Sequence, residues 1–344
     1  MLRRLLIVLL MFGLAPGLWF RAQLAPRNVD QRITMAALPL ARGCCQIGPF
    51  KLDAVWQLTG RNNDFGSYSG MVRIEPGRML AFSDRGYFLD FPDPSPGTHA
   101  VRIGPTVGGK DDIKDNRDVE AATYDPASRR LWLALEWRNA ISRHGADLHR
   151  QVLYNPPAMR DWPNNSGPEA MVRLRDGRFI VLAEAFSGWS DSSRNPALLF
   201  PGDPTTGTAP QTFTFSGPEN YRPTDMAQLP DGRVLIVMRR LLWPFPVRTA
   251  VRIVLADPAA ITVGGLWQGQ QIAALDAPLP IDNFEAITID QAADGTITVW
   301  LMSDDNGAIS QRTLLWRMML DPAKLPPLAR AADKQKARNQ IARP

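Results

Sequence analysis

The sequence repeats one short pattern, in which an acidic residue opens two alternating apolar runs that are separated by an Asp-Gly turn. The clearest copy begins at Pro168-Glu169-Ala170, turns at Asp176-Gly177 and ends at Ala183-Glu184. Alternation with a period of two predicts strands, and Asp-Gly between two such runs predicts a β-hairpin. The two acids of a hairpin then lie side by side at one edge of the sheet, because its strands are antiparallel.

Five copies of this hairpin follow one another along the chain. Their opening residues, roughly 50 to 60 positions apart, are Ser69, Glu120, Glu169, Asp225 and Glu285. A period near this length with about four strands per unit is typical of a β-propeller, and the period-two alternation excludes helical solenoids.

Outer strands are expected after the hairpins, for example at 197–200 and 212–215, at 249–256 and 271–275, and at 312–320. The last repeat lacks a fourth strand, which residues 49–56 can supply, so that the closed ring has no exposed edge. We therefore predict an all-β fold: a propeller of five or six four-stranded antiparallel blades, closed by strands from both ends of the chain.

The two ends of the chain differ from the repeats. Residues 1–21 place Arg3 and Arg4 before an apolar run, which predicts a signal peptide or an N-terminal anchor. We expect a linker at 22–46, the propeller at 47–321 and a disordered basic tail at 322–344. The predicted location is periplasmic or secreted, or anchored to the inner membrane by the N-terminus, which would be the only contact with a membrane.

The net charge of +5 does not indicate a nucleic-acid-binding protein. The tail carries six basic residues and one acid, so the folded part is close to neutral. The only cysteines, Cys44 and Cys45, are adjacent and do not predict a disulfide framework. We expect a monomer that acts on a small anionic or ester substrate.

The repeated acids are the candidate functional residues, because the first strand of each propeller blade lines the central channel. Several carboxylates at one mouth of the channel repel one another, so their pKa values rise or cations compensate them. Calcium, which binds roughly six to eight oxygen ligands, is the candidate cofactor. The predicted metal ligands are Glu120, Glu169, Asp225, Glu285, Asp304 and Asp305. The predicted catalytic residues are Asp84, Arg85, Glu136, Glu184 and Arg239. In the structural alternative, the acids accept hydrogen bonds from backbone amides of neighbouring blades and brace the ring.

Several motifs in this order resemble the phytase-like family, whose domain is described as "esterase-like activity of phytase". They are Ser83-Asp84-Arg85-Gly86, the Glu-Ala openings at Glu120, Glu169 and Glu285, and Ser303-Asp304-Asp305-Asn306 followed by Arg312-Thr313-Leu314-Leu315. The resemblance spans about residues 48–320. The family usually has Glu-Gly at the openings, and Glu-Arg where this chain has Arg239-Arg240.

The resemblance implies an exported bacterial propeller that hydrolyses phosphate or carboxylate esters, and calcium follows by analogy with β-propeller phytases. A non-catalytic periplasmic propeller that binds a ligand or a protein is the alternative. A lactonase-like or sugar-oxidising propeller is a third possibility, and the presence of only three histidines argues against the sugar-oxidising form.

Overall fold

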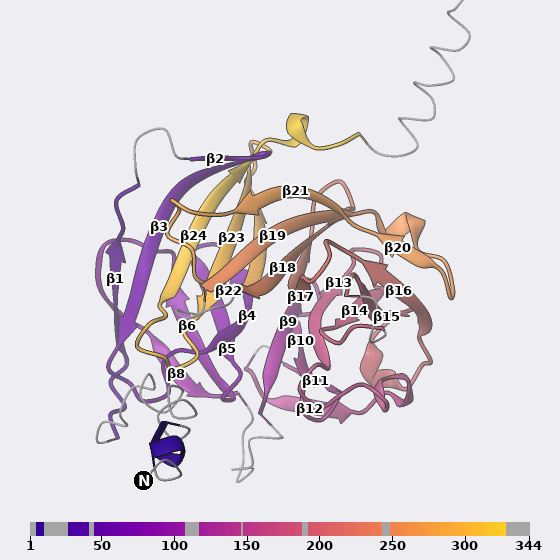
Figure 1. Ribbon diagram of the computed structural model, residues 1–344, viewed down its shortest axis with the longest axis horizontal. Coiled ribbons are helices and arrows are strands. Elements are labelled where there is room, and N and C mark those ends of the chain that lie inside the picture. Colours follow the sequence, from indigo (N-terminus) through magenta and orange to yellow (C-terminus); the bar gives the residue numbers. More distant parts are fainter. Residues whose placement is uncertain are drawn as a thin grey trace, which may run out of the picture.

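The structure is a computed structural model that describes residues 5–9, 27–40, 45–106, 117–145, 147–187, 192–242 and 248–327. Five antiparallel sheets surround a common axis, and each sheet forms one blade (Figure 1). The innermost strands of the blades contact one another around the ring and lie toward the middle of the view. They are β4 (Tyr68–Glu75), β9 (Val119–Asp125), β13 (Pro168–Arg173), β17 (Arg222–Gln228) and β22 (Asn283–Gln291).

The blades are numbered here in chain order, and each takes its remaining strands from the sequence that follows its inner strand. Blade 1 adds β5 (Arg78–Ser83), β6 (Tyr87–Pro92) and β8 (Arg102–Pro105). Blade 2 adds β10 (Arg130–Leu135), β11 (Ala140–His144) and β12 (Arg150–Tyr154). Blade 3 adds β14 (Phe179–Ala183), β15 (Arg194–Phe200), β16 (Gln211–Ser216) and the parallel β20 (Leu266–Gln268). Blade 4 adds β18 (Val234–Leu242), β19 (Arg248–Ala256) and β21 (Gln270–Leu275). Short 3-10 helices occupy the connections η2 (Pro157–Met159), η3 (Pro204–Thr206), η4 (Pro258–Ala260) and η5 (Pro322–Lys324).

Blade 5 closes the ring with strands from both ends of the chain, as predicted. It joins β22, β23 (Ile297–Asp304) and β24 (Thr313–Leu320) to β3 (Phe50–Gly60), and Leu315 pairs with Trp56. The all-β propeller is therefore confirmed, and the blade number is five. The expected outer strands at 197–200, 212–215, 249–256, 271–275 and 312–320 all lie on observed strands, apart from Arg312, which precedes β24.

The expectation that residues 22–46 form a linker needs correction, because this segment contains strand β1 (Arg32–Ala37). This strand pairs with β3 on one side and with β7 (Gly97–Ala100) on the other, and so ties blade 5 to the loop region of blade 1. Ile33 and Met35 alternate with exposed residues and are buried, which is the period-two signal of a half-buried strand. The short β2 (Gln46–Ile47) also pairs with β3.

Apolar side chains fill the spaces between neighbouring blades. One cluster of buried residues brings Val172 and Ile180 of blade 3 against Met226 and Ile236 of blade 4. Because strands in the middle of a blade are covered on both faces, β14 is buried along its whole length and β18 is buried from Val234 to Met238. These layers hold the inner strands rigidly, which is what a site at the channel needs.

Residues 5–9 form a helical segment with exposed side chains, and the rest of the predicted signal or anchor lies outside the described residues. Most of the predicted basic tail, from residue 328 onward, lies outside them as well. Within the described ranges, no helix has the length and apolar character required to cross a membrane.

Candidate metal centre

A β-bulge at the start of every inner strand defines the candidate site. The register of each inner hairpin skips one residue there, and those five residues are Ser69, Glu120, Glu169, Thr224 and Glu285. A bulge bends the strand and re-aims the side chain of the extra residue. Three of the five bulges thus present a glutamate at the same height of the ring.

A second ring of residues lies on the second strand of each hairpin or directly after it, beside the bulge. Its members are Asp84, Glu136, Glu184, Arg239 and Asp304, which face Ser67, Asp118, Gly167, Arg222 and Asn283 across the hairpins. The two rings lie next to each other because the hairpins are antiparallel. We call this end of the channel the rim.

Asp225 does not belong to the rim, which corrects its assignment as a metal ligand equivalent to the glutamates. The bulge of blade 4 falls on Thr224, one residue earlier. The carboxylate of Asp225 is fully buried and accepts hydrogen bonds from Met226 N at 2.8 Å and from Ile287 N at 2.9 Å. It therefore braces blade 4 against blade 5, as in the structural alternative for the repeated acids.

Five rim carboxylates come together as what we call the acidic cluster: Asp118, Glu120, Glu136, Glu169 and Glu184. It consists of two triplets that share Glu136, and within each triplet one oxygen of every carboxylate lies within 4.8 Å of the other two. All five residues are at most 8% exposed. Buried oxygens at this separation can hold a metal ion.

Burial and mutual repulsion raise the pKa values in the acidic cluster. Burial raises the pKa of Glu136 to about 7, and the charges of Asp118 and Glu184 add to the effect. Burial, with the charges of Glu184 and Glu136, also raises the pKa of Glu169 well above its ordinary value. The pKa of Glu120 rises well above its ordinary value through burial and the nearby charge of Glu169. The fold thus concentrates negative charge that a cation would neutralise.

Arg239 compensates acids of the rim directly beside the acidic cluster. Its guanidinium lies 2.6 Å from Glu285 and 3.4 Å from Glu184, and it donates a hydrogen bond to Asn283 at 2.9 Å. Burial alone would lower its pKa, but the charges of Glu285 and Glu184 raise it. Glu285 therefore has an internal cation as its partner, so it is placed as an ion-pair residue beside the cluster.

Asp84 and Asp304 lie on the same side of the rim as Glu285. The pKa of Asp304 rises well above its ordinary value because the residue is buried, and because Glu285 and Asp84 are charged neighbours. Asp84 also adds to the negative charge around Glu120. Both residues therefore lie where they were predicted, although neither joins a triplet of the acidic cluster.

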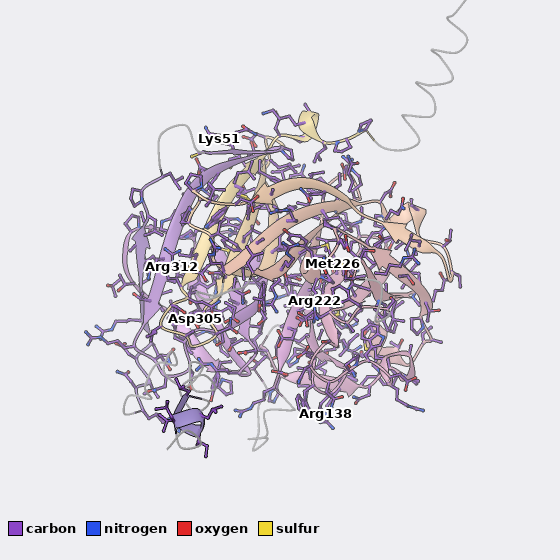
Figure 2. The ribbon with its side chains drawn as sticks, in the orientation of Figure 1. Lys51, Arg138, Arg222, Met226, Asp305 and Arg312 are labelled. Carbon is purple, nitrogen blue, oxygen red and sulfur yellow. The ribbon has the colours of Figure 1, made fainter. Side chains whose placement is uncertain are left out.

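Arg85 and Asp305 both make hydrogen bonds that hold loops beside the rim, and the catalytic and metal roles expected for them stay predictions. Arg85 donates hydrogen bonds to the carbonyls of Asn63 at 3.2 Å and Phe65 at 2.7 Å. Asp305 accepts hydrogen bonds from Ser67 N at 3.2 Å and from the hydroxyl of Thr313 at 2.8 Å. Figure 2 shows Asp305 toward the blade that carries β23, away from Arg222 near the middle of the view.

A pocket of about 650 Å³ adjoins the acidic cluster, and Glu184 belongs to both. We call it the arginine pocket; its walls are Glu184, Phe186, Asn220, Arg222, Arg239, Arg240, Leu241 and Leu242. Arg222 donates to Glu184 at 3.0 Å and covers the ring of Phe186 at 4.9 Å. Arg222 and Asp118 were not predicted from the sequence as site residues. Each lies two residues before the bulge of its blade, and the same position in every repeat is therefore a candidate site position.

Comparison with known proteins agrees with this architecture. The chain matches the model of the phytase-like family, described as "Esterase-like activity of phytase", over residues 63–307. It therefore belongs to the phytase-like family, as the sequence motifs suggested. No curated protein matches the chain.

Several solved structures are distantly similar to this chain. A gluconolactonase from Xanthomonas campestris is 13% identical with a TM-score of 0.43, and the match covers 88% of this chain and 98% of that one. The glutaminyl cyclase of Myxococcus xanthus is 11% identical with a TM-score of 0.44, covering 79% of this chain and 97% of that one. The WD40 β-propeller domain of Doa1 is 11% identical with a TM-score of 0.38, covering 80% and 99%. Likeness at this level says nothing about what the present chain does.

Proposed function

We propose that this protein is a calcium-dependent hydrolase of phosphate or carboxylate esters, with its metal at the acidic cluster. The observation that carries the proposal is the pair of buried carboxylate triplets that share Glu136. Bracing of the ring needs no such concentration, because Asp225 braces two blades with a single carboxylate.

The residues of the cluster fit calcium. All the side chains of both triplets are carboxylates, and hard cations such as Ca²⁺ take oxygen ligands. Asp118, Glu120, Glu136, Glu169 and Glu184 would hold the ion. Bound calcium would supply positive charge that polarises the scissile ester and offsets the charge of an anionic substrate.

The surrounding residues suit the remaining tasks of ester hydrolysis. Arg222 and Arg240 point their charge into a pocket beside the cluster, where guanidinium groups match carboxylate and phosphate oxygens. Burial raises the pKa of Asp304 well above its ordinary value, so this carboxyl is our candidate proton donor to the leaving alcohol. Glu136 and Glu184, predicted as catalytic, are reassigned to metal binding because they lie inside the triplets.

The proposal extends to the location and the assembly of the protein. The basic and apolar character of residues 1–21 supports export to the periplasm, with the N-terminus cleaved or kept as an anchor. We propose that the exported protein acts as a monomer. Cell fractionation and N-terminal sequencing test the first statement, and light scattering tests the second.

The test is hydrolysis of p-nitrophenyl phosphate and p-nitrophenyl acetate by the full-length protein, with calcium or with a chelator. Glu136→Gln and Glu169→Gln should abolish calcium-dependent turnover. Asp176→Asn is the matched control, because this carboxylate is 52% exposed and pairs only with its turn neighbour Arg178 among the described residues. A folded protein that hydrolyses neither ester would favour the non-catalytic binding propeller instead.

A further inference from the structure

The arginine pocket and the acidic cluster form one continuous site. Glu184 is a wall of the pocket and a member of the second triplet, so a ligand in the pocket lies directly beside the metal-binding carboxylates. The chemical character of the pocket therefore restricts which esters can reach the cluster. The identity of the reaction rests on the proposed function, but the binding of the ligand does not.

The charge of the pocket favours a ligand with a single anionic group. Of its three arginines, Arg239 is held by Glu285 and Glu184, at 2.6 Å and 3.4 Å. Within the described part of the chain, Arg222 has one ion pair, to Glu184, and its side chain is 40% exposed. Arg240 is exposed and stacks on Tyr221, with its guanidinium carbon 5.4 Å from the ring centroid. Arg222 and Arg240 thus leave charge for one small anion.

Part of the pocket wall is apolar. Phe186, whose ring Arg222 covers, contributes to it together with Leu241 and Leu242, and Leu241 is 52% exposed. An apolar group of a ligand that covers this leucine would contribute about 25 cal/mol of binding free energy per Å² of apolar surface removed from water. A ligand with phosphate groups on every side offers nothing to this wall and would place charge against it.

We infer that the site selects esters that join one anionic group to one aromatic or acyl group, rather than polyphosphorylated polyols. The anion lies against Arg222 and Arg240, and the apolar group lies on Leu241. In the reaction, a water oxygen forms a bond to the phosphorus or acyl carbon, and the ester bond to the alcohol oxygen breaks. The proton lost by the water is balanced by the proton that the leaving alcohol gains.

Binding of phenylphosphonate and methylphosphonate tests the inference, because neither compound has an ester bond to hydrolyse and they carry the same charged group. The full-length protein, with calcium present, is titrated with each compound by calorimetry. We expect phenylphosphonate to bind about tenfold more tightly, which corresponds to partial burial of one ring. Leu241→Ser should reduce the preference to about threefold or less. Arg240→Gln should weaken the binding of both compounds.

Val263→Ser is the control, since Val263 is equally apolar, 67% exposed and outside the pocket. Equal affinity for the two phosphonates, or a preference that Leu241→Ser leaves unchanged, would overturn the inference. Selective binding without any ester hydrolysis would support the inference and contradict the proposed function. Ester hydrolysis without a preference for the phenyl group would support the proposed function and contradict the inference.

Discussion

Replacing Glu136 by glutamine should stabilise the metal-free protein and remove its response to calcium. The substitution takes one negative charge from both triplets and keeps the size of the side chain. Its amide oxygen can still accept the hydrogen bond that Gly167 N donates to Glu136 at 3.3 Å. The charge is therefore the main difference between the two proteins.

The magnitude follows from the pKa of Glu136. The pKa is about 7 in the folded protein, where burial is the main cause, against 4.5 for an ordinary glutamate. A tenfold change in the acid dissociation constant corresponds to about 1.4 kcal/mol, so ionised Glu136 costs the metal-free fold about 3 kcal/mol. Below pH 4.5 the carboxyl is protonated in both the folded and the unfolded chain, and the cost vanishes. The cost grows as the pH rises to about 7 and is complete above it.

Urea unfolding in the presence of a chelator, from pH 4.5 to pH 8, measures this difference. We expect Glu136→Gln to exceed the wild type by about 3 kcal/mol at pH 8 and to match it near pH 4.5. Added calcium should then raise the stability of the wild type and have little effect on the variant. A variant that is less stable than the metal-free wild type at pH 8 would show that ionised Glu136 does not destabilise the fold.

Three further predictions concern buried polar residues outside the acidic cluster. Asp225→Ala should lower the free energy of unfolding by about 2 to 5 kcal/mol, because it removes the acceptor of two buried amides, Met226 N and Ile287 N. The affinity for calcium should not change, and a weaker affinity would show that Asp225 is a metal ligand. Arg239→Gln should destabilise the fold by about 3 to 5 kcal/mol, since it leaves Glu285 buried without its cation; an unchanged urea midpoint would contradict this. Burial lowers the pKa of His144 to about 4, so its protonation favours the unfolded chain below pH 6.5. Relative to His144→Gln, the wild type should lose about 3 kcal/mol between pH 7 and pH 4, and a difference that does not vary with pH would count against the assignment.

The fold could be read from the sequence because its signals are local and repeated. The hairpin of Glu169 and Glu184 is visible in the alternation and in the Asp-Gly turn, and both strands lie where they were expected. Ring closure followed from a missing strand in the last repeat and a spare strand near the N-terminus. Strand β1 was missed because only Ile33 and Met35 carry its alternation, within a short polar segment.

The site was predicted less completely, because its geometry depends on the bulges. Asp225 looks like the glutamates when the repeats are aligned with one another, but the bulge of blade 4 lies one residue earlier and turns its carboxylate toward the backbone of the next blade. Arg85 and Asp305 are close to the rim in sequence, but loop carbonyls and amides engage them. Asp118 joins the cluster through its backbone pairing with Glu136, and its place two residues before the bulge was not considered as a candidate position.

Calorimetric titration of the full-length protein with calcium is the most direct test of a calcium site in the acidic cluster. It is run at pH 7.5 in two buffers that differ in their enthalpy of ionisation. We expect binding to the wild type with release of protons, because burial raises the pKa values of acids such as Glu169 and Glu120 and a bound cation would lower them again. Glu136→Gln should lose this binding, and Asp176→Asn should keep it. A wild type that does not bind calcium, or a Glu136→Gln variant that binds it with the same affinity, would contradict a metal site in the acidic cluster.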